Sequence, residues 1–230
     1  MKTAAAALAL MLLCGCGALR AVVSPAPNVY SLADARGTPT PAPPRAAATL
    51  TLTVSPPHAA AGFDSPRMMY LRQADKLEYF AHNEWVDTPA RMLAPLLVAA
   101  VESGGTFRAV VQTPSAAAGD MRLDTEILRL QQEFLGAPSR VRFTLRAYVV
   151  ESATRRVIAT REFEAMVPAA SEDPDGGAAA ANAAVRTVLG NLAAFCAEAA
   201  RGVATASGPT PAPAIPLSAA KAGGAPIPRD

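Results

Sequence analysis

A strict alternation of apolar and polar residues occupies positions 141–149. The apolar set is Val141, Phe143, Leu145, Ala147 and Val149, and between them stand Arg142, Thr144, Arg146 and Tyr148. Successive side chains of a strand point to opposite faces, so this period of two predicts one buried and one solvent-exposed face. The segments 121–134 and 156–166 are also strand-like, and turn residues separate the three. The pattern predicts an antiparallel meander.

Shorter strands are predicted upstream. Residues 49–54 alternate apolar and hydroxyl side chains, which is typical of a half-buried strand. Residues 68–71 and 77–80 predict two strands around a turn, and the apolar insert at 29–32 predicts one short strand more.

Two helices are predicted. Thr88 and Pro89 form a helix start, and apolar residues then recur at helical spacing up to Gly104, with a kink expected at Pro95. A Pro- and Gly-containing break at 173–177 precedes a second helix, whose apolar positions run from Val185 to Ala199 and which should stop near Gly202. The expected fold is α+β, an antiparallel sheet with two main helices packed on one face.

The N-terminus has the features of an export signal. Lys2 is followed by an apolar run over 4–13, too short for a permanent membrane span. The run ends in Leu13-Cys14-Gly15-Cys16, which resembles a bacterial lipobox. Residues 1–15 are therefore predicted to be a signal peptide removed before Cys16, which would carry diacylglycerol. Gly17 and Ala18 follow in place of the aspartate that commonly retains lipoproteins in the inner membrane, so the outer membrane is favoured.

Proline divides the rest of the chain. Residues 16–48 are rich in Ala and Pro and are expected to be a tether reaching up to roughly 90 Å. Residues 49–201 should form the folded domain, and 202–230 a disordered Pro- and Ala-rich tail.

Composition argues against several kinds of chemistry. A net charge of +2, with basic residues spread singly, gives no footprint for nucleic acid. His58 and His82 are too isolated to suggest a metal site, and a phosphate-binding loop is absent from the sequence. Cys196 is expected to be a small core residue. We therefore expect no enzymatic activity and no cofactor apart from the lipid on Cys16.

Two groups of residues are candidates for partner or ligand contact. Tyr79, Phe80 and Trp85 could form an aromatic patch, although Trp85 is better explained as a core anchor, with Asp87 and Thr88 as a helix cap. Arg142 and Arg146 could face an acidic partner or be ordinary residues of an exposed sheet face; the sequence leaves both interpretations open.

Several ordered motifs resemble those of one protein family. They are Tyr30-Ser31-Leu32, then Leu77-Glu78-Tyr79-Phe80, Trp85 through Leu93, Ser103 through Phe107, Leu123-Asp124-Thr125-Glu126 and Val157 through Phe163. Behind the lipobox, this series resembles the auxiliary lipoproteins of ABC-type lipid transport systems, the paraquat-inducible protein C-like family.

The resemblance implies a periplasmic accessory to a system whose transport subunit carries mammalian-cell-entry (MCE) domains. It also allows a ring-like homo-oligomer, for which the sequence holds no self-complementary signature. We expect the domain to dock that subunit to the outer membrane. The alternatives are a lipoprotein that itself binds a lipid or other hydrophobic ligand, and a scaffold for cell-envelope assembly.

Overall fold

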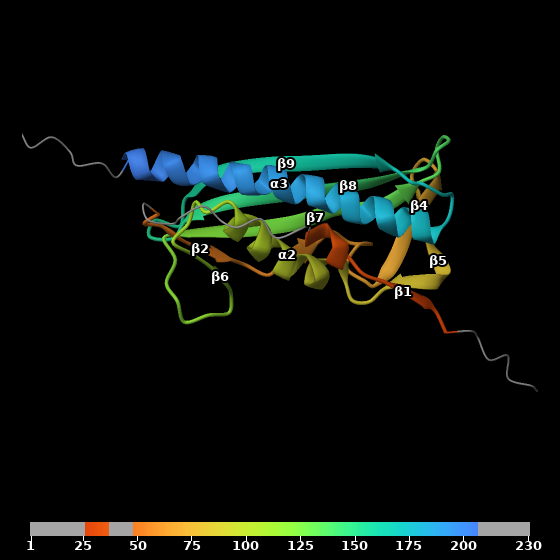
Figure 1. Cartoon of the computed structure of the whole chain (residues 1–230), viewed down its shortest axis with the longest axis horizontal. Coiled ribbons are helices and arrows are strands. Elements are labelled where there is room, and N and C mark those ends of the chain that lie inside the picture. Colours follow the sequence, from red (N-terminus) through yellow and green to blue (C-terminus); the bar gives the residue numbers. More distant parts are fainter. Residues whose placement is uncertain (1–25, 37–47, 207–230) are drawn as a thin grey trace, which may run out of the picture.

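The computed structural model describes residues 26–36 and 48–206 (Figure 1). The signal peptide, Cys16, much of the tether and the end of the tail lie outside the described residues. In chain order the elements are β1 (Asn28–Tyr30), the 3-10 helix η2 (Ala33–Arg36), β2 (Thr51–Val54), β3 (His58–Ala59), β4 (Arg67–Gln73), β5 (Lys76–Trp85), α2 (Pro89–Ser103), β6 (Ala109–Gln112), β7 (Met121–Glu133), β8 (Arg140–Glu151), β9 (Val157–Pro168) and α3 (Pro174–Ala206).

The long strands β7, β8 and β9 form the predicted antiparallel meander. The five apolar residues of β8 are all buried, which confirms the inner face that their alternation predicted. The outer face is less exposed than predicted, because Thr144 is fully buried beneath its neighbours. Its hydroxyl donates a hydrogen bond to Glu164 of β9 at 3.2 Å.

The other half of the sheet is mixed, so the prediction of an antiparallel sheet is wrong in this part. Three short strands, β2, β3 and β4, lie one after another along the free edge of β7 and run parallel to it. Beyond them, β2 pairs with β6 in parallel, β4 pairs with β5 antiparallel, and β5 pairs with β1 in parallel. Side-chain alternation reports which face is buried but carries no information on strand direction.

Strand β2 lies between β6 and β7 and is buried on both faces, including Thr51 and Thr53. The prediction of a half-buried strand is therefore wrong. The Thr53 hydroxyl donates to the carbonyl of Met121, and a hydrogen bond of this kind lets a hydroxyl be buried at low cost. Strands that run parallel to their neighbours are commonly covered on both sides.

Helix α2 begins as predicted, with Thr88 as the cap and Pro89 at the first helical position, and it ends before Gly104. It is one continuous helix through Pro95, whose side chain is exposed. The bend at that proline stays a prediction.

Helix α3 is longer than predicted, because it begins at Pro174 and continues to Ala206. The predicted break at 173–177 is wrong: Asp173 accepts a hydrogen bond from the amide of Gly176 at 2.8 Å and so caps the helix. The Asp173-Pro174 pair is the same start signal as Thr88-Pro89.

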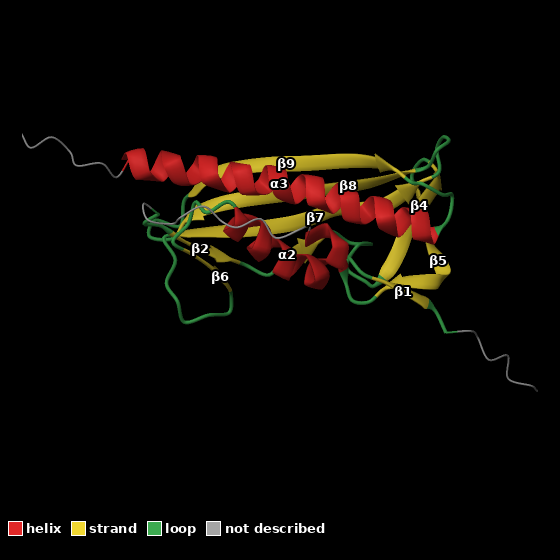
Figure 2. Cartoon of the chain, viewed as in Figure 1, coloured by secondary structure: helices red, strands yellow, loops and turns green. Residues whose placement is uncertain are grey.

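Buried residues of both helices and of the sheet belong to one hydrophobic core, which establishes the α+β class. Helix α3 contacts β8 and β9, and α2 contacts α3 and β6. Figure 2 shows both helices in front of the strands in this view. The N-terminal elements belong to the same unit, because η2 contacts both helices and Leu32 is buried in the core. The tether between Cys16 and the folded domain is therefore much shorter than the sequence suggested.

Candidate functional site

The three aromatic residues proposed as a contact patch do not form one surface. Trp85 is buried in the core, at 4% exposed. Phe80 is partly buried and packs on Tyr70, with ring centroids 4.5 Å apart. Tyr79 alone is open to solvent, at 49% exposed, and the Arg67 guanidinium lies 4.2 Å from the centre of its ring. Neighbouring positions of a strand face opposite sides, so Tyr79 and Phe80 cannot share a contact.

The segment after β5 serves to start helix α2. Asp87 accepts a hydrogen bond from the amide of Thr88 at 2.7 Å, and the Thr88 hydroxyl accepts one from the amide of Arg91 at 3.4 Å. A salt bridge of 3.5 Å joins Asp87 to Arg91. Together with the burial of Trp85, these contacts favour the structural interpretation of the motif over a contact role.

Both candidate arginines are paired with carboxylates of neighbouring strands. Arg142 lies between Glu133 of β7, at 2.8 Å, and Glu164 of β9, at 2.9 Å. Arg146 lies between Glu126 of β7, at 3.5 Å, and Glu162 of β9, at 3.2 Å. Each arginine is thus bracketed by two acidic side chains. An acidic partner would have to compete with them, which favours the ordinary sheet-face interpretation.

Glu133 is the most buried of the four carboxylates that pair with these arginines, at 8% exposed. Burial alone would raise its pKa, but hydrogen bonds from Arg142 and Gln131, together with the positive charges of Arg142 and Arg129, outweigh burial and lower the pKa. The residue therefore stays ionised, held by the side chains around it. The cross-strand ion pair with Arg142 explains why Glu133 is buried, and a catalytic role is not needed to explain it.

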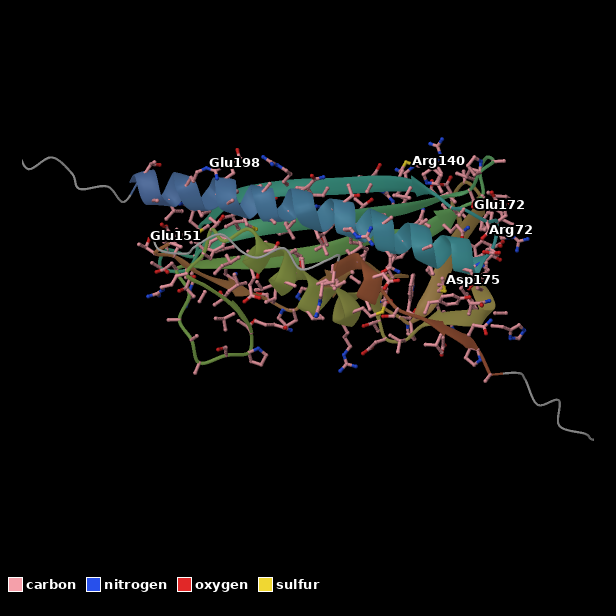
Figure 3. All side chains as sticks on the ribbon, in the orientation of Figure 1. Arg72, Arg140, Glu151, Glu172, Asp175 and Glu198 are labelled. Carbon is pink, nitrogen blue, oxygen red and sulfur yellow. The ribbon has the colours of Figure 1, made fainter. Side chains whose placement is uncertain are left out.

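An open groove of about 520 Å³ lies between β9 and the C-terminal turns of α3. Its apolar lining includes Ile158, Phe195 and Val203, and Arg161 and Glu198 form a salt bridge of 3.2 Å at its edge. Figure 3 labels Glu151 and Glu198 at this end of the molecule, and Arg72, Arg140, Glu172 and Asp175 at the opposite end. The groove has the size of a small-molecule site but is open to solvent.

The space between the sheet and α3 is filled near the start of that helix. A void of about 10 Å³ remains beside Trp85, Leu130 and Ala181, which is about the volume needed to hold one water molecule. Further along the helix, Cys196 is fully buried, as predicted for a core residue, and burial raises its pKa to about 12. A thiol with this pKa is not a nucleophile at neutral pH.

The two histidines are both exposed, His58 in β3 and His82 in β5. In the part of the chain that the structure covers, no group of three or more metal-ligating side chains comes together. Over the same residues, no helix has the length and apolar character needed to cross a bilayer.

Of the exposed apolar residues along β1 and β5, sequence reasoning named only Tyr79 and missed the others. Val29 is 56% exposed, Val86 is 61% exposed, and Leu77 and Tyr79 are also exposed. No periodic signal marked them, because β5 contains irregular pairing to β4 and its side-chain alternation shifts along the strand.

The contacts that fix β1 were also missed. The Tyr30 hydroxyl donates to Asp175 of α3 at 3.0 Å, and the buried Asn182 donates to the Ser31 carbonyl at 2.9 Å and accepts from the Ala35 amide at 2.9 Å. These partners are separated by about 150 positions in the chain, beyond the reach of any local pattern.

These features define a small α+β domain with a filled core and without an evident reaction centre in its described part. The sequence matches the ABC-type transport auxiliary lipoprotein component family over residues 30–193, and the chain belongs to this family. The resemblance inferred from the motifs is thereby confirmed, and the protein is a lipoprotein of a transport system.

Solved structures agree in fold. A protein from Xanthomonas campestris, of the family DUF330, is 26% identical with a TM-score of 0.65 and covers 78% of this chain and 97% of its own. An uncharacterized protein is 13% identical with a TM-score of 0.58 and covers 74% of this chain and 99% of its own. No curated protein matches the chain.

Proposed function

We propose that this lipoprotein is anchored through Cys16 to the periplasmic face of the outer membrane and docks an MCE-domain transport subunit there. The family match over residues 30–193 carries the proposal, because it makes the chain an auxiliary component of an ABC-type transport system. The lipobox at Leu13–Cys16 supports the anchor, and Gly17 with Ala18 supports outer-membrane sorting. The transported molecule would be a phospholipid or another hydrophobic compound.

The domain would act by binding and not by catalysis. The buried Cys196 and the paired Glu133 are explained by packing and by ion pairing, which leaves neither with a chemical task. Hydrolysis of ATP would occur in another subunit, since the sequence holds no phosphate-binding loop.

The test is crosslinking in cells that express the full, lipidated protein. A photo-crosslinking amino acid replaces each of two exposed threonines in turn, so that two sides of the domain are sampled. Thr160 lies on the outer face of β9, and Thr187 lies on the solvent side of α3. Capture of an MCE-domain protein from either position supports the proposal, and the productive position identifies the docking side. A Cys16→Ala variant, which lacks the anchor, is the matched control and should lose most of the capture.

Two results would contradict the proposal. Recovery of only outer-membrane assembly or cell-wall proteins would favour the envelope-scaffold alternative. Unchanged permeability to detergents in cells that lack this protein and any paralogue would argue against a role in lipid transport.

The alternative of a lipid carrier has one observation in its favour, the groove of about 520 Å³ between β9 and α3. Its apolar floor at Ile158, Phe195 and Val203 fits an acyl chain or a similar group. Native mass spectrometry of the domain, purified without detergent, decides this case. A bound lipid that is lost in a Gly202→Trp variant, which fills the groove edge, would establish a carrier, and an apo mass would reject it.

A further inference from the structure

Four exposed apolar side chains gather on the outer side of one sheet edge. Val29 lies in β1, Leu77 and Tyr79 lie in β5, and Val86 follows β5 directly. We call them the β1–β5 apolar surface. Their exposed fractions lie between 40% and 61%, whereas apolar residues of this size in the same sheet are mostly buried.

Strand register places these residues on the same side. Val29 pairs with Glu84, and the next pair, Tyr30 with Trp85, points inward because Trp85 is in the core. Val29 and Glu84 therefore face outward, and Val86, two positions past Glu84, follows them.

The register also brings Tyr79 to that side. Arg67 pairs with Glu84 and also covers the ring of Tyr79 at 4.2 Å, so these side chains share the outer face. Tyr79 pairs with Met69, and Leu77, two positions before Tyr79, pairs with Leu71. The surface thus runs from β1 across β5 toward β4.

The lipid anchor lies close to this surface in the chain. Asn28, the first residue of β1, follows Cys16 by only twelve positions. A connection of that length spans at most about 40 Å when fully extended, and about 20 Å as a random coil. The bilayer is consequently present at a high effective concentration beside Val29, whereas a protein partner has to arrive by diffusion.

The chemistry of the surface suits the headgroup region of a bilayer. Tyr79 presents an apolar ring with a polar hydroxyl, a kind of side chain enriched at membrane–water interfaces. The charged side chains on this face are of opposite sign, since Arg67 lies opposite Glu84 in the strand register. Binding should therefore depend on apolar contact and little on anionic lipid or on salt.

We infer that the β1–β5 apolar surface rests on the membrane that holds the anchor, and so orients the domain on that membrane. The inference depends on the lipidation of Cys16 that the proposed function includes. It assigns the lipid bilayer as the occupant of a surface to which the proposed function gives no occupant.

Single-cysteine labelling tests this in the lipidated protein. Acylation would block Cys16, and Cys196 is buried with a pKa of about 12, so an introduced cysteine can be labelled selectively. The test variant is Val86→Cys. The matched control is Val157→Cys, which is 52% exposed and lines the groove at the opposite end, beside Glu151 and Glu198. Each carries an environment-sensitive fluorophore, and each protein is reconstituted in phosphatidylethanolamine–phosphatidylglycerol vesicles with and without nitroxide-labelled lipid.

The expected result is loss of most fluorescence at position 86 with nitroxide lipid, unchanged in high salt, and no loss at position 157. Equal, weak quenching at both positions in protein that floats with the vesicles overturns the inference while leaving anchoring intact. If the fluorophore at position 86 becomes shielded from solvent only after an MCE-domain protein is added, the inference is also overturned and the surface is assigned to that partner. Failure of the protein to float would instead contradict lipidation at Cys16, and with it the proposed function.

Discussion

Gly176 and Gly190 lie in the same helix, α3, yet the same substitution should change stability in opposite directions at the two positions. A Cβ at Gly176 would lie 2.4 Å from the carbonyl oxygen of Ser171 and 2.7 Å from its amide nitrogen. These are backbone atoms, so the chain before the helix would have to move. A Cβ at Gly190 would meet nothing within 4 Å.

The magnitudes follow from these contacts. Placing an extra methyl group in a tight site costs about 1–3 kcal/mol of stability. Alanine is favoured over glycine inside a helix by roughly 1 kcal/mol, but near the first turn only part of this gain offsets the cost. Gly176→Ala should therefore lose about 1–2 kcal/mol, whereas Gly190→Ala should gain about 0.5–1 kcal/mol. For a chain of this size these changes correspond to roughly 2–8 °C down and 1–4 °C up in Tm.

Thermal unfolding of the unlipidated chain, followed by circular dichroism, measures both variants against the parent. The two proteins differ only in the position of one methyl group on one helix, so the comparison cancels general effects of the substitution. A Gly176→Ala variant as stable as the parent would refute the reasoning, because it would show that the loop before α3 yields freely. Destabilisation by Gly190→Ala would show that this side of the helix is not open.

Three further predictions concern the core, the ion pairs and a helix cap. Cys196 should resist a thiol reagent at neutral pH in the folded protein and react fully in urea, because burial raises its pKa to about 12; rapid reaction without urea would contradict its burial. The lowered pKa of Glu133 means that its ion pair stabilises the fold above the ordinary pKa of 4.5 and that this contribution is lost as the pH falls through the lower folded-state value. Arg142→Met should therefore lower the free energy of unfolding in urea by roughly 1–3 kcal/mol at neutral pH and by much less in acid. Glu133→Gln, which removes the other partner of the pair, is the control. An equal loss at both pH values would count against the pairing. Thr88→Ala should cost about 0.5–1 kcal/mol, at the low end for a cap because the hydrogen bond is 3.4 Å long, and Thr88→Ser should restore it.

The predictions from sequence were most accurate where they depended on a local pattern of residues. The alternation in β8 reported a buried face because each strand residue reverses direction, and Thr88-Pro89 marked the start of α2 because capping involves neighbouring residues only. The same signal at Asp173-Pro174 was masked by Gly176 and Gly177, which local rules assign to a break. Gly176 admits the backbone of Ser171 in the loop just before the helix. The role of Gly177 is tertiary, because a Cβ there would lie 2.2 Å from the side chain of Gln132 in β7.

The candidate site was less predictable than the fold. The burial of Trp85 agrees with its predicted role as a core anchor, but only strand pairing decided that Tyr79, in the same strand, is exposed. Likewise, Arg142 and Arg146 were visible as an arginine row, but the carboxylates that bracket them come from β7 and β9.

The sequence by itself determined the lipobox, the family, the meander and the two helices, because each depends on motifs or periodicities within one segment. Only the tertiary structure decided the parallel pairing along β7, the attachment of β1 to β5, and thus how short the connection from Cys16 to the domain is. The physical reason is that strand pairing, side-chain hydrogen bonds and burial join distant segments, in one case about 150 positions apart. Their partners are selected by the whole packed core and not by neighbours in the chain.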